Sequence, residues 1–295
     1  MKIPDMLENF EHVIIGDVAY FPNLDNNTYH NGPGISSSNI RRFSQSQLHA
    51  LEEVVEQTPA MMFGSAAHSL IVEGEAAFFS DVVTITGSPY TNTNKQLKKD
   101  SLEKGLSVIT EEQRDTIYSM NNSLVQEAEP YLRPNKDYPQ VFKSSKEVSI
   151  YWYEQDLLCK TRADVVCNAF DNTFGEDAIV LVDYKTTSDC SVRGFTNSVR
   201  RYSYDLQAAW YKRGFERAGF KVADFVFVAQ EKKPPYANKV FKMNHADMEI
   251  GWNFLSDYLD DYTKVLGGKP ATIYNSPNVV ELNTGNFYRE DQNDR

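Results

Sequence analysis

The stretch Ala178-Ile-Val-Leu-Val-Asp183-Tyr-Lys185-Thr-Thr187 decides the fold. Its apolar run is typical of a buried strand, and the run ends at Asp183. Side chains alternate between the two faces of a strand, so Asp183 and Lys185 are predicted to share one face, with Tyr184 on the other. A carboxylate and an amine at the end of a buried strand are costly unless something compensates them. The pair is either a structural ion pair or part of a site.

A second carboxylate enters from the preceding predicted strand. Residues 157–164 form the second half of a predicted hairpin and end at Asp164. Asp164 and Asp183, together with the backbone carbonyl of Tyr184, suit Mg²⁺, which takes oxygen ligands and keeps several waters. Lys185 would then lie close to the metal, where its amine can orient or deprotonate an attacking water.

A helix is predicted after this strand, over residues 195–220. In it Gln207 and Tyr211 are four residues apart and share one face. Their polar groups can orient the lysine or hold a phosphodiester near the metal. Arg200 and Tyr204 extend the same polar face.

An upstream helix adds a histidine. Apolar residues recur at helical spacing between Met61 and Phe79, and His68 lies beside that stripe, one turn beyond Gly64. We expect His68 to lie near the metal; a core or surface histidine is the alternative. Glu73 follows five residues later, and Glu147 begins the first strand of the hairpin. Both are candidate acids of the site, although Glu147 can equally be an edge-strand charge.

These elements, taken in chain order, resemble the PD-(D/E)xK nuclease superfamily and, within it, the RecB and RecE branch of DNA exonucleases. Gly64-x-x-x-His68 resembles its upstream helix, Asp164 its first acidic position, Asp183-Tyr184-Lys185 its (D/E)xK element, and Gln207-x-x-x-Tyr211 its last motif. Ala163 departs from the pattern, because it stands where the family has a proline. Tyr29-His30 and Pro33-Gly-Ile-Ser-Ser-Ser38 are similar to the N-terminal segment of phage RecE-type recombination exonucleases.

The resemblance implies one or two Mg²⁺ ions, replaceable by Mn²⁺, with His68 as a further ligand beside Asp164, Asp183 and the Tyr184 carbonyl. Lys185 would activate the water, and Gln207 and Tyr211 would position the substrate or the lysine. It also implies 5′-to-3′ degradation of linear double-stranded DNA from its ends, a ring-shaped homo-oligomer, and a single-strand annealing protein as partner in phage or prophage recombination.

Charge distribution matters more than the net charge of −11, which by itself does not suit a DNA-binding protein. Between Cys190 and Arg213 the basic residues outnumber the single acid Asp205. A basic channel on an acidic body and a solvated charged helix are both open. The candidate DNA-binding residues are Arg162, Arg193, Arg200, Arg201 and Tyr204.

Composition excludes several other classes. The three cysteines argue against a disulfide framework, a zinc site and an iron–sulfur cluster, which needs a larger set of thiolates. No apolar run reaches the roughly 18 residues of a membrane span, so we expect a soluble cytoplasmic protein. No Gly-x-x-x-x-Gly-Lys loop is present, which argues against an ATP-driven helicase.

The predicted fold class is α/β (α+β), with a restriction-endonuclease-like core in which helices flank a central mixed sheet. At 295 residues with 41% hydrophobic residues the chain can form one large domain. We expect a mostly helical region at 1–135, the nuclease core at 136–268 and a polar tail at 269–295. Two alternatives to an exonuclease are a structure-specific or nicking endonuclease and a DNA-binding protein without catalysis.

Overall fold

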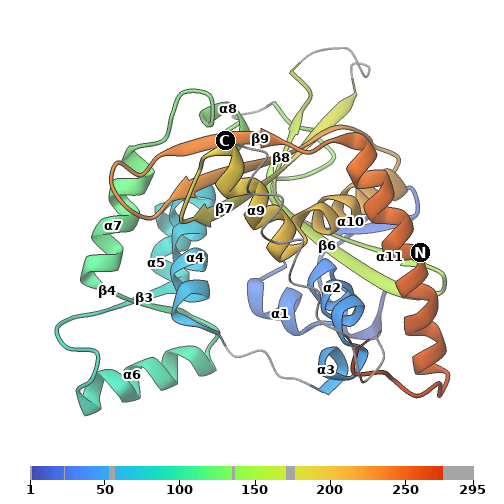
Figure 1. Ribbon diagram of the computed structural model, residues 1–295, viewed down its shortest axis with the longest axis horizontal. Coiled ribbons are helices and arrows are strands. Elements are labelled where there is room, and N and C mark those ends of the chain that lie inside the picture. The colour runs from blue at the N-terminus through green and yellow to red at the C-terminus, as the bar shows by residue number, and fades with distance from the viewer. Residues whose placement is uncertain (1, 23, 53–56, 135–136, 171–176, 275–295) are drawn as a thin grey trace, which may run out of the picture.

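A seven-stranded sheet runs through the molecule in the order β1-β2-β5-β6-β7-β8-β9 (Figure 1). The computed structural model describes residues 2–22, 24–52, 57–134, 137–170 and 177–274. The strands are β1 (Val13–Ile15), β2 (Val18–Phe21), β5 (Lys146–Glu154), β6 (Leu157–Asn168), β7 (Ala178–Thr187), β8 (Lys221–Glu231) and β9 (Asn238–Lys242). All neighbours are antiparallel except β7 and β8, which run parallel. The mixed sheet and the α/β class are therefore confirmed.

The central strands β6, β7 and β8 are buried over most of their length, as their runs of Val, Ile, Leu and Phe require. Two helices, α9 (Val192–Tyr202) and α10 (Tyr204–Arg217), connect β7 to β8. Parallel strands need such a crossover, since a tight turn cannot join them. The crossover brings the Gln207-x-x-x-Tyr211 segment back over the end of β7.

One face of the sheet is covered by α2 (Ser37–Gln45), α10 and α11 (His245–Leu266) (Figure 1). Its core is rich in aromatic side chains, among them Trp152, Trp210, Phe215, Phe225 and Phe227. Gly214 allows α10 to approach the sheet closely, because a Cβ there would come within 2.8 Å of the Trp152 ring.

Another group of helices packs on the opposite face. It comprises α4 (Pro59–His68), a π-helical turn (Ser69–Glu73), α5 (Glu75–Asp81), α7 (Glu111–Asn122) and α8 (Glu129–Leu132). Phe63, Ala67, Leu70, Ile117 and Met120 from these helices share a core with Val180, Val182, Val226 and Val228 of the sheet. The alternation along β7 thus sends Val180 and Val182 towards α4, and Asp183 towards α10.

Smaller elements complete the fold. A two-stranded parallel sheet, β3 (Val82–Ile85) and β4 (Ser107–Thr110), lies beside α5, and its connection carries α6 (Asn92–Glu103), which projects at the lower left of Figure 1. A 3₁₀ turn (Asp5–Leu7), α1 (Asn26–Asn31) and α3 (Gln47–Glu52) belong to the N-terminal part. No helix within the described ranges is both long enough and apolar enough to span a membrane.

Two local expectations differ from the structure. The region 1–135, expected to be mostly helical, also contributes β1 and β2 to the main sheet, joined by a two-residue turn at Gly16-Asp17, where Gly16 has φ +55°. The single helix expected over 195–220 is broken at Ser203, which adopts a left-handed conformation with φ 51°. Of the expected tail at 269–295, residues 275–295 lie outside the described residues.

Candidate active site

The two aspartates meet where strands β6 and β7 separate. These strands pair only as far as Val165 and Val182; beyond that point β6 continues beside β5, and β7 beside β8. Asp164 and Asp183 are the next residues on the two strands, so both stand at the opening of the fork. The fork thus brings carboxylates from two buried strands together at a point where no backbone hydrogen bonds join those strands.

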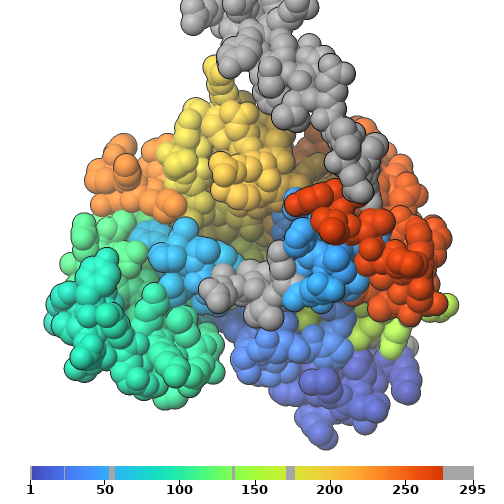
Figure 2. Space-filling view, turned by 60° about the horizontal axis from the view of Figure 1, so that its bottom comes forward, coloured from blue at the N-terminus to red at the C-terminus, as the bar shows by residue number. Residues whose placement is uncertain are grey.

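A cleft of about 720 Å³ opens at this fork. His68, Glu147, Asp164, Lys185 and Tyr211 line its interior. Its outer walls come from residues 24–27, at the start of α1, and residues 104–107, between α6 and β4. Figure 2 shows these two walls as separate lobes, blue and green, with a hollow between them. The cleft therefore brings the predicted residues of four distant segments together.

Asp183 is the most buried acid of the site, with 1% of its surface exposed. Lys185 Nζ lies 2.5 Å from its Oδ1, and the Gln207 side-chain amide donates a hydrogen bond to its Oδ2. Both carboxylate oxygens of Asp183 therefore have a partner, Oδ1 in the ion pair with Lys185 and Oδ2 in the hydrogen bond from Gln207. Burial raises the pKa of Asp183 to about 6, although Lys185 opposes the rise.

Lys185 is held between the acid and an aromatic ring. Its Nζ stands 5.0 Å from the centre of the Tyr204 ring. Burial lowers the pKa of Lys185, but Asp183, Tyr204 and Asp164 more than offset this, and the pKa lies above its ordinary value. The position of the amine is thus fixed by two partners.

Asp164 and His68 form the other half of the site. His68 Nε2 lies 3.3 Å from Asp164 Oδ2 and 3.5 Å from Glu147 Oε1, and its Nδ1 lies 3.3 Å from Glu73 Oε1. Burial lowers the pKa of His68, but the three carboxylates raise it well above the ordinary value. Burial also raises the pKa of Glu147 to about 7, against the attraction of His68 and Arg162. Both candidate acids, Glu73 and Glu147, are therefore beside His68.

Tyr184 connects the two halves through its main chain. Its N–H donates to Asp164 Oδ2 at 2.7 Å, which places the peptide between Asp164 and Asp183. The phenol points to the opposite face and donates to Gln230 at 2.8 Å. This division follows from strand alternation, as the sequence predicts.

Arg162 differs from its predicted role in phosphate binding. Its side chain is 6% exposed, and its guanidinium donates to Ser149 Oγ, Asn26 Oδ1 and the carbonyl of Leu24 at 2.6–2.7 Å. It also lies 3.5 Å from Glu147 and 4.1 Å from the centre of the Tyr29 ring. Its N–H groups are thus used by acceptors inside the protein, so a structural role is the better interpretation. In that role Arg162 holds Glu147 and the start of α1 in position.

The other predicted DNA-binding arginines are outside the cleft. Arg193, Arg200 and Arg201 are exposed on α9, and none of them is among the residues that line the cleft. Tyr204, at the start of α10, is half-buried under Lys185. Contact of the arginines with DNA remains a prediction for the surface beside the site.

Two residues near the site were not predicted. Tyr29 lines the cleft between Arg162 and Lys160. Arg41 of α2 donates to the carbonyl of Tyr202 at 2.5 Å and so ties α2 to the break between α9 and α10. Tyr29 could have been found from the N-terminal segment, whose motif includes it; nothing in the local pattern indicates the partner of Arg41.

The residues present fit a divalent cation. Asp164 and Glu147 both lie within 3.5 Å of His68 Nε2, and Asp183 adjoins Asp164 through the Tyr184 peptide. Single donor atoms of His68, Glu73 and Glu147 lie within 4.8 Å of one another. Carboxylates gathered in one place repel each other. A cation would neutralise this repulsion.

Comparison with known proteins agrees with this geometry. No curated protein matches the chain. The crystal structure of a protein from Eubacterium rectale, described as a "Putative exonuclease", is similar over 90% of this chain and 98% of its own, with a TM-score of 0.59 and 14% identity. At this identity the likeness shows the fold.

Among protein families, residues 36–276 match the one described as "PDDEXK-like domain of unknown function (DUF3799)". The match covers most of the chain and includes the elements that carry His68, Glu147, Asp164, Lys185 and Tyr211. The chain therefore belongs to this family of PDDEXK-like domains.

Proposed function

We propose that the protein is a divalent-metal-dependent deoxyribonuclease, with Mg²⁺ as its metal. The family and the fold support a nuclease. The observation that carries the proposal is the meeting of His68, Asp164 and Lys185 in one cleft, at a fork between two buried strands, with Asp183 paired to Lys185 at its base. A structural ion pair between Asp183 and Lys185 alone would not need the further carboxylates of Asp164 and Glu147 gathered beside it around His68.

Asp164, Asp183, the Tyr184 carbonyl and His68 would hold the metal, and Glu147 is placed to reach the same ion or a second one. Mg²⁺ or Mn²⁺, when bound, would polarise the scissile phosphate and activate the attacking water. Gln207 donates a hydrogen bond to Asp183 Oδ2. This bond, together with the burial of β7 on both faces, keeps Asp183 in position to bind the metal.

Lys185 orients the attacking water in this proposal. Its amine is fixed between Asp183 and the Tyr204 ring, so it offers its remaining hydrogen-bonding directions towards the cleft. Tyr211, one helical turn after Gln207, lines the cleft and would position the substrate strand. Arg200 and Arg201, on the exposed surface of α9, would contact phosphates outside it.

Exonuclease action on linear double-stranded DNA is the more specific part of the proposal. It is supported by the resemblance to RecE-type enzymes and by the description of the Eubacterium rectale protein as a "Putative exonuclease". The same resemblance extends the proposal to 5′-to-3′ polarity, a ring-shaped oligomer and a single-strand annealing partner in phage-type recombination.

Digestion of DNA tests the function. Linear duplex labelled at its 5′ ends and a covalently closed circle are incubated with the wild-type protein in Mg²⁺ or in EDTA. Lys185→Ala is the catalytic variant, and Lys242→Ala, which removes an exposed lysine paired with Asp224, is the matched control. We expect loss of the linear DNA alone, only with Mg²⁺, and only with the wild type and Lys242→Ala.

Each other result has a defined meaning. Early release of labelled 5′-mononucleotide supports 5′-to-3′ polarity, whereas late release indicates digestion in the 3′-to-5′ direction. Cleavage of the circle indicates an endonuclease with the same chemistry, because a closed circle offers no end to an exonuclease. If Mg²⁺ and Mn²⁺ both leave the two DNAs intact, the proposal of catalysis is wrong, and a DNA-binding role is to be measured instead.

A further inference from the structure

The turn that follows His68 has an unusual geometry. Residues 69–73 form a π-helical turn, in which the N–H of Gly74 donates to the carbonyl of Ser69 at 2.8 Å. In an α-helix of 3.6 residues per turn, a residue five positions on lies about 140° around the axis. In a π-turn, whose hydrogen bonds span five residues, it lies about one turn away on the same side. The wide turn thus brings Glu73 beside His68.

The imidazole of His68 consequently has different partners at its two nitrogens. Glu73 Oε1 lies 3.3 Å from Nδ1, while Asp164 Oδ2 and Glu147 Oε1 lie 3.3 and 3.5 Å from Nε2. Glu73 is therefore at the opposite edge of the ring from Asp164. Lys146 Nζ, from β5, lies 3.5 Å from the main-chain carbonyl of Glu73 and anchors the turn to the sheet.

We propose that Glu73 is a positioning residue: its carboxylate accepts the Nδ1 proton of His68 and leaves the lone pair of Nε2 directed at the divalent cation. The inference rests on the proposed function, because it assigns Glu73 a role in holding that cation. Histidines that bind metals commonly donate their second ring N–H to a carboxylate, which fixes the tautomer and the ring orientation. The π-turn would be the structural device that supplies this carboxylate.

Direct binding of the metal by Glu73 is the competing role. Single donor atoms of His68, Glu73 and Glu147 lie within 4.8 Å of one another, so these three residues could surround an ion. The contact of Glu73 with Nδ1, however, puts its carboxylate on the far side of the ring from Asp164. An ion bound by Nε2 and Asp164 would therefore meet the ring at a different nitrogen from the one that Glu73 contacts.

Binding of Mn²⁺, measured by calorimetry without DNA, is the first test. Removing an outer partner of a metal ligand typically weakens metal binding about 10–100-fold, and we expect this for Glu73→Ala. Glu73→Gln keeps an oxygen that can accept the Nδ1 proton, so its loss should be smaller. Glu75→Gln is the control, because it removes the same charge from an exposed position on α5 and should bind as the wild type does.

The tautomer of His68, measured by ¹⁵N NMR of histidine-labelled protein with Mg²⁺, is the second test. The His68 signals are identified by their absence in His68→Asn. We expect a protonated Nδ1 and an unprotonated Nε2 in the wild type and Glu73→Gln, and a changed tautomer or protonation pattern in Glu73→Ala. A purely structural Glu73 would alter thermal unfolding without moving these signals.

The outcomes separate the inference from the proposed function. If the wild type binds no Mn²⁺ in the cleft, the proposed function fails, and the inference fails with it. If the wild type binds Mn²⁺ and Glu73→Ala binds equally well, only the inference is overturned. It is also overturned if affinity falls while the His68 tautomer stays the same, because Glu73 would then bind the metal itself.

Discussion

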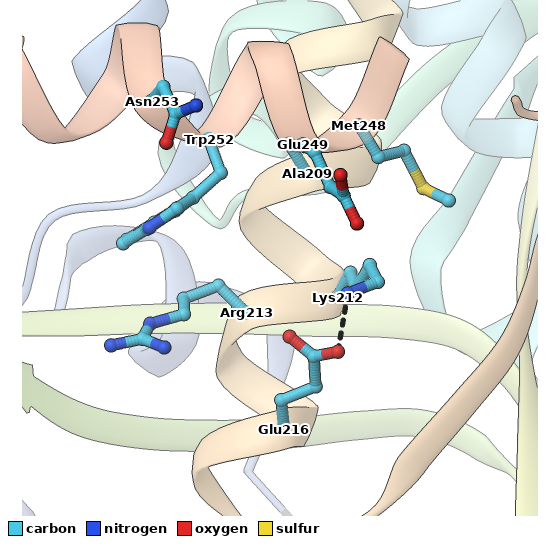
Figure 3. A pocket seen from close by; sticks show the side chains of 8 residues that line it. All are labelled: Ala209, Lys212, Arg213, Glu216, Met248, Glu249, Trp252 and Asn253. Carbon is cyan, nitrogen blue, oxygen red and sulfur yellow. Dashed lines mark hydrogen bonds and ion pairs between the residues drawn. The ribbon is translucent and has the colours of Figure 1, made fainter. Parts of the chain in front are cut away.

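Helix α10 separates two regions of the molecule that differ in how completely their charged side chains are paired. On its outer side, a groove of about 240 Å³ lies between α10 and α11 and contains Lys212, Arg213, Glu216 and Trp252 (Figure 3). Arg213 makes two hydrogen bonds of 2.8 and 2.9 Å to Glu154 and stands 5.0 Å from the centre of the Trp252 ring. Lys212 points at Glu216 and pairs with it (Figure 3). Both cations of the groove therefore have an acid partner.

The cleft on the inner side is different, because acids exceed their partners. Four acids, Glu73, Glu147, Asp164 and Asp183, share only three basic partners, His68, Lys185 and Arg162. Paired charges such as those of the groove stabilise a fold modestly. Crowded, incompletely satisfied charges cost stability and are typical of functional sites. This contrast is the reason for proposing that the active site lies on the inner side of α10.

The largest expected effect is that of Asp183→Asn. The substitution removes a charge that would bind the metal directly. DNA hydrolysis should therefore fall by more than about 100-fold, which is the upper limit for loss of a residue that only supports a metal ligand. Initial rates on linear duplex in saturating Mg²⁺ measure this. Asp224→Asn, which breaks the exposed pair with Lys242, is the control and should hydrolyse DNA normally. Equal rates for the two variants would contradict the contrast between the regions.

Metal binding should stabilise the folded protein. A ligand at about 100 times its dissociation constant adds roughly 2.7 kcal/mol to the free energy of unfolding, and thermal unfolding in Mn²⁺ and in EDTA measures it. Glu147→Gln removes one of the crowded acids, so the variant should unfold at a higher temperature than the wild type in EDTA and gain less from Mn²⁺. A wild-type unfolding temperature that does not respond to Mn²⁺ would show that the crowded acids bind no metal.

Gly214→Ala tests how closely α10 must approach the sheet. The new methyl group would meet the Trp152 ring at 2.8 Å and the Thr161 methyl at 3.1 Å, and such overpacking typically costs about 1–3 kcal/mol. Gly64→Ala is the control, because its Cβ would meet only Thr186 Oγ1 at 3.6 Å. Urea unfolding measures both variants. A Gly214→Ala protein as stable as Gly64→Ala would mean that α10 is free to shift.

The smallest effect is expected in the groove. Arg213→Ala removes the pair with Glu154 and the contact with Trp252, which are worth about 1 kcal/mol together at such a half-exposed position. Its unfolding free energy should fall by that amount, while DNA hydrolysis at saturating substrate stays at the wild-type rate. A large loss of hydrolysis in a variant that remains folded would assign the groove to the site.

Much of the cleft could be predicted because it depends on strand alternation and short helical spacing. Asp183 and Lys185 had to share a face of β7, and Gln207 and Tyr211 had to share a face of α10. The mixed sheet follows from a hairpin, a crossover and a further hairpin, each with its own pattern. These features are local, so the sequence shows them directly.

The features that escaped prediction depend on local exceptions or distant contacts. Glu73 was predicted as a candidate acid of the site, but the π-turn that brings it beside His68 was not, because hydrophobic periodicity does not reveal such a turn. The break at Ser203 coincides with the contact between Arg41 and Tyr202, far away in the sequence. Arg162 was expected to face DNA because it is two residues from Asp164, but its partners come from α1 and β5. The hairpin at Gly16-Asp17 had a readable signal, a two-residue turn that begins with glycine.

Anomalous diffraction from crystals containing Mn²⁺ tests the central claim most directly. The account predicts an anomalous peak in the cleft, bonded to Asp164 and Asp183 with His68 Nε2 as a further ligand, and no peak in the groove between α10 and α11. The peak should vanish in Asp183→Asn. A cleft without Mn²⁺ at saturating concentration, or an ion bound only in the groove, would contradict the assignment of the cleft as the metal site.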